Sequence, residues 1–180
     1  MLTLEKVDVN GADRAALLDF MTSHHFPFHV RSRLSVMDVQ EMIDDGDFHD
    51  AEHESHWLIH PEHGRIGLVR LEDLEDPTPL FDLRLATSWR GQGLGEQALN
   101  AITSYVFGRF GEVTRFEGQT REDNIAMRKV FERCGWLKEA HYRESWPVAG
   151  APAVASVAYA ILRRDWETGT TTTFEWNDLD

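Results

Sequence analysis

Apolar and polar residues follow two different periods along the chain. They alternate over residues 2–9, which predicts a half-buried strand. Apolar residues then recur at helical spacing from Asp13, and again from Ser35 until Gly46, which indicates two consecutive helices. The connection between these helices is rich in aromatic and imidazole side chains.

The same two periods continue to residue 162 and are interrupted by glycines and prolines. The expected elements are strands over 56–60, 65–71 and 80–85, a helix from the glycines at 91–95 to Gly108, a strand over 115–120, a helix over 124–134, and strands over 137–146 and 154–162. The order β-α-α-β-β-β-α-β-α-β-β predicts one α/β domain with a mixed sheet (α+β) over 1–165. Residues 166–180 are expected to form a polar C-terminal tail.

Charge and composition exclude several classes of protein. The net charge is −13, but residues 1–83 carry −12 of it and residues 84–133 carry +2. Such a balance argues against non-specific nucleic-acid binding, which depends on neutralising phosphates. We expect no membrane partner and a cytoplasmic location, because no apolar run approaches about 20 residues and no signal peptide opens the chain. Cys134, the single cysteine, excludes an intramolecular disulfide framework.

The most specific motif is Arg90-Gly91-Gln92-Gly93-Leu94-Gly95, between a predicted strand and a predicted helix. Glycines there allow the backbone to approach a ligand, and the helix N-terminus favours an anion such as pyrophosphate. A Walker loop would need Lys-Ser/Thr after the last glycine, where Glu96-Gln97 stands. A nucleotide-binding phosphate loop is therefore disfavoured.

With this loop in place, the sequence resembles the GCN5-related N-acetyltransferases. Their coenzyme A loop has the pattern Arg/Gln-x-x-Gly-x-Gly/Ala, which Arg90, Gly93 and Gly95 match. A second family element runs from an asparagine to Gly-aromatic across one helix, as from Asn124 to Gly135-Trp136. The resemblance covers about residues 1–165 and is greatest to the branch that includes the ribosomal-protein N-acetyltransferases.

The resemblance implies an enzyme that transfers an acetyl group from acetyl-CoA to a primary amine by direct attack in a ternary complex. Acetyl-CoA would be the cosubstrate and would lie where strands 80–85 and 115–120 splay apart. The acceptor would be a small amine or a peptide N-terminus. The residues implied to bind the coenzyme are Leu83, Leu85, Arg90, Gly91, Gln92, Gly93, Leu94, Gly95 and Asn124.

The catalytic acid is where the chain departs from the family pattern. Many members have Tyr at the position of Phe131, and the ribosomal-protein branch often has Ser at the position of Met127; neither residue here can donate a proton. Glu117 and Asp82 are the candidate bases, and Tyr142 is a weaker candidate acid. Both carboxylates have structural alternatives: an ion pair with Arg84 or Arg115 for Asp82, and a cross-strand pair for Glu117. A non-catalytic acyl-CoA-binding or sensor module therefore stays open as a second reading.

The connection between the first two helices covers the acceptor site in this family. His25, Phe28 and His29 are therefore the expected substrate-binding residues, and a histidine there could relay protons near neutral pH. An acidic approach surface favours a cationic amine acceptor. No metal is expected, because the histidines around residues 53–63 lack the HExxH spacing. The sequence leaves the oligomeric state open, a homodimer included.

Overall fold

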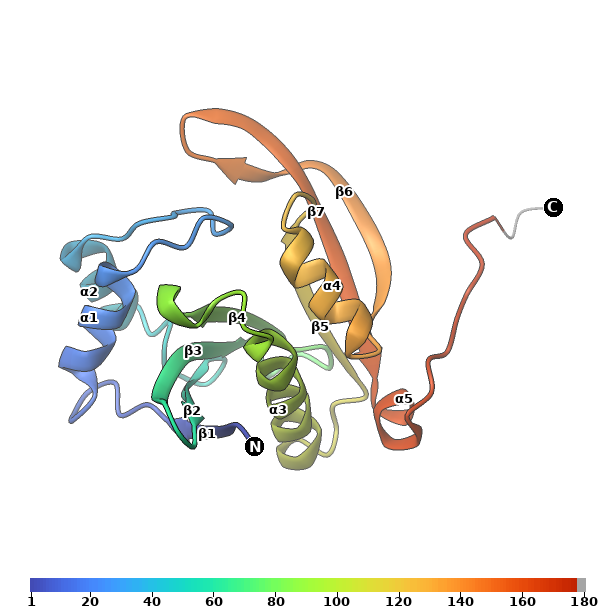
Figure 1. Cartoon of the computed structure of the whole chain (residues 1–180), viewed down its shortest axis with the longest axis horizontal. Helices are drawn as coiled ribbons and strands as arrows, with labels where there is room; N and C mark the ends of the chain where they lie inside the picture. The colour runs from blue at the N-terminus through green and yellow to red at the C-terminus, as the bar shows by residue number, and fades with distance from the viewer. Residues whose placement is uncertain (178–180) are drawn as a thin grey trace.

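The chain folds into two antiparallel sheets with helices on both faces (Figure 1). The computed structural model describes residues 1–177. In chain order the elements are β1 (Thr3–Lys6), α1 (Arg14–Ser23), α2 (Val36–Asp44), β2 (Glu54–His60), β3 (Gly64–Glu72), β4 (Leu80–Leu85), a 3-10 turn η1 (Thr87–Trp89), α3 (Leu94–Arg109), β5 (Arg115–Arg121), α4 (Ile125–Arg133), β6 (Leu137–Val148), β7 (Ala151–Leu162) and α5 (Arg163–Thr168). Within residues 1–177, no helix has the length and apolar character needed to cross a bilayer.

The two sheets meet at β4 and β5 but are not hydrogen-bonded along their length. The first sheet has the order β1-β2-β3-β4 and the second the order β5-β7-β6. At the start of the two strands, the Glu117 N–H donates to the Pro79 carbonyl at 3.2 Å. Beyond that bond each strand pairs only with its own sheet, so β4 and β5 separate toward their C-terminal ends.

Alternation along the strands divides the core into two layers. Leu58 and Val69 pack in the cluster that α3 and α4 cover, whereas Trp57 and Leu68 pack in the cluster that α1 and α2 cover. Successive strand residues point to opposite faces, which explains why neighbours in sequence belong to different clusters. Helices therefore cover both faces of the first sheet, with α1 and α2 on one side and α3 on the other (Figure 1).

The observed elements follow the predicted order, but several bounds differ. The last two strands are longer than predicted, since β6 extends to Val148 and β7 begins at Ala151. The first strand ends at Lys6 instead of reaching residue 9, because Val7 and Val9 pack against α1 and α2 while the chain turns toward α1. Arg163–Thr168 form a short helix, α5, so the predicted tail at 166–180 starts inside it. Residues 178–180 of that tail lie outside the described residues.

Candidate active site

The loop before α3 has the conformation that its glycines predict. Gly91 and Gly93 have φ of 72° and 78°, and Gly93 is the N-cap residue of α3. A Cβ atom at either position would meet nothing within 4 Å, so open space lies beside the loop. The first amides of the 16-residue helix have no intrahelical acceptor, and these N–H groups with the helix dipole favour an anion.

The other residues of the motif pack or hydrogen-bond within the protein. A Cβ on Gly95 would lie 3.1 Å from Val130 Cγ2, so this glycine allows α3 and α4 to approach closely. Leu94 is buried in the core, and the Gln92 side-chain amide donates to the Ser88 carbonyl at 2.6 Å. Any contact of Gln92, Leu94 and Gly95 with a phosphate would therefore come from the backbone.

The edge of β4 offers backbone groups to the gap. The Ala86 N–H donates to the Ile66 carbonyl of β3 at 2.9 Å. Because hydrogen-bonding direction alternates in an antiparallel pair, Leu83 and Leu85 direct their N–H and C=O groups away from β3, toward β5. This edge fits an extended ligand that carries amide groups, as the pantetheine arm of coenzyme A does.

Arg90 connects the glycine loop to the α1–α2 loop. Its Nε donates to the Leu85 carbonyl at 2.9 Å, and its Nη1 donates to the His25 carbonyl at 2.6 Å. Its guanidinium also lies over the Phe26 ring, 5.2 Å from the centroid. Arg90 therefore holds the α1–α2 loop against the C-terminal end of β4. Its predicted role in coenzyme binding stays a prediction.

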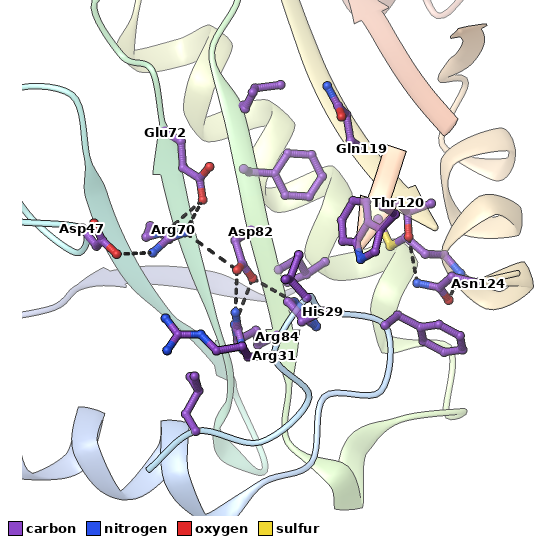
Figure 2. A pocket seen from close by; sticks show the side chains of 18 of the residues that line it. His29, Arg31, Asp47, Arg70, Glu72, Asp82, Arg84, Gln119, Thr120 and Asn124 are labelled. Carbon is purple, nitrogen blue, oxygen red and sulfur yellow. Dashed lines mark hydrogen bonds and ion pairs between the residues drawn. The ribbon is translucent and has the colours of Figure 1, made fainter. Parts of the chain in front are cut away.

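A cavity of about 470 Å³ lies in the gap between β4 and β5 (Figure 2). Side chains from β3, β4, β5, α4, the α1–α2 loop, the end of α2 and the β6–β7 hairpin line it. Five of the predicted site residues line the cavity: Phe28, His29, Asp82, Leu83 and Asn124. Met127 and Phe131 line it as well, so the two departures from the family pattern face the expected reaction site.

The α1–α2 loop lies across both strands of the gap. On the β4 side, His29 Nε2 lies 3.0 Å from Asp82 Oδ1 (Figure 2). On the β5 side, Arg121 Nη1 donates to the Pro27 carbonyl at 3.2 Å and its guanidinium lies over the Phe28 ring. The His25 side chain is exposed and does not line the cavity.

Asp82 is held in a network of cationic groups. Arg84 donates to it from Nε at 3.0 Å and from Nη2 at 2.8 Å, and Arg70 Nη2 lies 4.0 Å away. Burial alone would raise the pKa of Asp82, but Arg84, His29 and Arg70 outweigh that effect and hold the pKa well below its usual range. The carboxylate is therefore ionised at neutral pH, and it is a weak base.

The other two predicted catalytic residues lie outside the cavity lining. Glu117 forms an ion pair with Arg115 at 2.7 Å and accepts from the Gln119 side chain at 2.9 Å. Arg115 also contacts Glu139, at 2.6 Å, which ties β5 to β6. Tyr142 on β6 is 47% exposed. Their catalytic roles stay predictions.

Asn124 has a structural role that the sequence motif does not reveal. Its side-chain oxygen accepts from the Met127 N–H at 3.3 Å and caps α4, and its amide nitrogen donates to Thr120 Oγ1 at 2.9 Å. This side chain faces the cavity with a fixed orientation (Figure 2). Contact with a bound pantetheine stays a prediction.

Sequence reasoning missed several residues that line the cavity. Arg70 and Glu72 come from β3, Arg31 and Asp47 from the segments flanking α2, and Trp146 from the far end of the β6–β7 hairpin. The alternation of residues along β3 indicates which face of the strand Arg70 lies on. It does not indicate which other elements pack against that face. Trp146 lies on β6 in a region of irregular register, and no local signal directs it to the gap.

The charges that line the cavity are balanced, which departs from the acidic surface expected from residues 1–83. Asp82 pairs with Arg84, while Asp47 and Glu72 both contact Arg70, at 3.6 Å and 2.6 Å. Arg31 pairs with Asp38 at 2.7 Å. Each carboxylate in the lining thus has a guanidinium partner, and the excess negative charge of the first half lies elsewhere.

One group of side chains among residues 1–177 could hold a metal ion, on the β2–β3 turn. Ligand atoms of His60, Glu62 and His63 lie within 4.8 Å of one another. The His60 and His63 rings are stacked at 4.4 Å, and His60 Nδ1 accepts from the Glu62 N–H at 3.2 Å. In-plane lone pairs of stacked rings do not converge on one point, so coordination would require the rings to turn. The prediction that no metal is bound stays a prediction.

Comparison with known families gives the class of protein. A family model described as acetyltransferase (GNAT) domain matches residues 2–137. The chain therefore belongs to the GNAT acetyltransferase family, and the predicted enzyme class, an acetyl-CoA-dependent N-acetyltransferase, is confirmed. The nearer likeness to the ribosomal-protein branch stays a prediction.

Solved structures show the same fold. The spermidine N-acetyltransferase from Vibrio cholerae in complex with CoA and spermine is 18% identical, with a TM-score of 0.75 over 92% of this chain and 98% of that chain. The spermidine/spermine N-acetyltransferase SpeG from the same organism, in complex with manganese ions, is also 18% identical, with a TM-score of 0.73 over 93% and 96%. The predicted fold is confirmed; at this identity the likeness concerns the fold alone.

Proposed function

We propose that this enzyme acetylates the primary amine of a small molecule or peptide N-terminus by direct attack in a ternary complex. The observation that carries the proposal is the order of groups along β4. The glycine loop and the α3 N-terminus follow the C-terminal end of this strand, and its residues 80–84 line the cavity beside His29 and Asp82. A coenzyme and an amine can therefore approach each other from opposite ends.

The coenzyme end is built from backbone groups. The amides from Gly91 to Gly95 would hold the pyrophosphate, and the Leu83 and Leu85 backbone would pair with the pantetheine arm. Asn124, the N-cap residue of α4, would contact that arm from the opposite side. Bound acetyl-CoA supplies the activated acetyl group, and the side chains at the other end position the amine and receive its proton.

The balance of charge in the cavity favours an acceptor with a single amino group. Among the described residues of the lining, each carboxylate already contacts a guanidinium, so a second ammonium group would find no unpaired acid. A polyamine acceptor, as in the spermidine enzymes, fits this cavity less well.

Thiol release from acetyl-CoA, measured with matched amines, tests the proposal. We expect turnover with a linear monoamine or a short peptide to exceed turnover with spermidine, measured as kcat/KM. Spermidine as the best acceptor would overturn the choice of acceptor but not the reaction. CoA binding in calorimetry without thiol release from any amine would favour the acyl-CoA-binding or sensor module instead. Acetylated product identified by mass spectrometry excludes simple thioester hydrolysis.

A further inference from the structure

His29 and Asp82 form an oriented pair inside the cavity. His29 Nε2 lies 3.0 Å from Asp82 Oδ1, and both residues line the cavity (Figure 2). Arg84 donates hydrogen bonds to the same carboxylate from two nitrogens, at 3.0 Å and 2.8 Å, and these bonds restrict rotation of the Asp82 side chain. The imidazole is therefore held by a carboxylate that is itself held by β4.

The pair determines which imidazole nitrogen carries the proton. An ionised carboxylate only accepts hydrogen bonds, so the neutral His29 ring must donate from Nε2. Its lone pair is then on Nδ1. Among the described residues, Nδ1 is buried and has no hydrogen-bond partner. Leaving such a buried group unsatisfied is unfavourable, which makes a ligand that supplies an N–H donor to Nδ1 favourable.

The other candidate bases are less suited to this role. The Asp82 oxygens already contact Arg84 and His29. Glu117 is engaged by Arg115 and Gln119 and does not line the cavity. Of the side-chain nitrogen and oxygen atoms of these three residues, His29 Nδ1 alone has no hydrogen-bond or ion-pair partner among the described residues.

We infer that His29 Nδ1 is the general base that takes the proton from the acceptor amine, and that Asp82 is a positioning residue that orients the imidazole. The inference rests on the proposed function. The amine nitrogen bonds to the acetyl carbon as the bond from that carbon to sulfur breaks. One amine proton passes to Nδ1, and the electron pair of the broken bond leaves on the sulfur.

The charged groups that line the cavity come from β3, β4, the α1–α2 loop and the segment after α2, and they include Asp47 and Glu72, which both contact Arg70. Asp82 and Arg84 face it from β4, Arg70 lies behind Asp82 on β3, Arg31 follows on the same loop, and Arg121 approaches Phe28 from β5. The linings from α4 and the hairpin are uncharged: Asn124, Met127, Phe131 and Trp146. Asp82 is thus the anion in contact with the imidazolium that proton transfer creates.

His29→Gln tests the assignment, with His53→Gln as its matched control. His53 also pairs with an aspartate, Asp50, at 2.8 Å, but it lies between α2 and β2 and outside the cavity lining. We expect His29→Gln to lower kcat at least about 100-fold while leaving the Kd for CoA unchanged. His53→Gln should retain wild-type kcat. Less than a threefold loss in an active, folded His29→Gln enzyme would overturn the inference.

The pH profile and rescue separate a base from a structural residue. At saturating substrates, kcat of the wild type should fall with slope one on the acid side, and His29→Gln should lack that limb. Added imidazole should restore turnover in His29→Ala but leave His53→Ala unchanged. An acid limb retained in His29→Gln, or no rescue in a His29→Ala enzyme that still binds CoA, would assign the base elsewhere. Wild-type enzyme without activity on any amine would instead refute the proposed function.

Discussion

The two ends of the β4–β5 gap are built on different principles. The end proposed to bind the coenzyme consists of backbone groups from one continuous segment, the glycine loop and the start of α3, and from one strand edge. The acceptor end consists of side chains that arrive from several separate elements and neutralise one another's charges. Backbone recognition is sensitive to φ and to added bulk. Side-chain recognition is sensitive to the loss of a single partner.

The largest effect is expected from Asp82→Asn, which removes the only anion among residues 1–177 that contacts both Arg84 and His29. Arg84 is 7% exposed and would be left as a buried charge with a neutral partner. Loss of one partner of a buried pair costs about 3–5 kcal/mol, so the free energy of unfolding should fall by that order. Turnover should fall as well, because His29 loses its orientation. Urea unfolding and kcat measure the two effects.

Asp44→Asn is the control for this change, because the Arg14–Asp44 pair is exposed and 3.5 Å long. It should cost less than about 1 kcal/mol. The stabilisation by Asp82 has a defined pH dependence. Its pKa is lower in the folded than in the unfolded state, so the contribution is present at neutral pH and is lost as the pH falls below the usual carboxyl range. An Asp82→Asn protein as stable as the wild type would contradict the buried network.

A carboxylate outside the gap provides an intermediate effect that should leave catalysis intact. Burial acts to raise the pKa of Glu54, but hydrogen bonds from Lys6, Tyr105 and His56 lower it from 4.5 to about 2. The pKa is depressed in the folded state, so about 3 kcal/mol of stabilisation is present above about pH 4.5 and is lost as the pH falls toward 2. Glu54→Gln should therefore destabilise the protein at neutral pH and progressively less in acid.

Urea unfolding of both proteins at neutral pH and at about pH 3 measures this difference. Glu54 does not line the cavity, so kcat at neutral pH should stay at the wild-type value. A parallel loss of turnover would mean that this network on β1, β2 and α3 is coupled to the acceptor end. The effects of Glu54 on stability and of Asp82 on turnover could then no longer be separated.

The smallest effect concerns the coenzyme end and a pair of glycines with the same backbone geometry. Gly93 and Gly64 have φ of 78° and 68°, and a Cβ at either would meet nothing within 4 Å. Alanine in this conformation should cost each protein about 1 kcal/mol. Only Gly93→Ala places its methyl group at the N-terminus of α3, so it should raise the Kd for CoA about tenfold. Equal CoA affinity of the two variants would show that the loop does not contact the coenzyme.

The elements and the glycine loop were predictable because their signals are local. The apolar spacing of α3 and the αL requirement at Gly91 and Gly93 involve residues a few positions apart. The pairing of Asp82 with Arg84 was one of two alternatives, since a residue two positions away on a strand lies on the same face. The choice between Arg84 and Arg115 needed the positions of β4 and β5.

The contact of His29 with Asp82 joins residues 53 positions apart. Nothing in the local sequence distinguishes His29 from the exposed His25 on the same loop. The distinction depends on how the loop is held across the gap by Arg90 and Arg121. The pairing of each carboxylate in the described cavity lining with a guanidinium likewise depends on the tertiary structure, because Asp47 and Arg70 lie on separate elements.

By itself, the sequence determined the order of strands and helices, the glycine loop and the family. Periodicity and backbone conformation depend on residues that are close together in the sequence. The tertiary structure decided which histidine of the α1–α2 loop contacts Asp82 and which charges cancel. Hydrogen bonds and ion pairs act over a few ångströms in space, whatever the separation along the chain. The acceptor end therefore exists only in the folded protein.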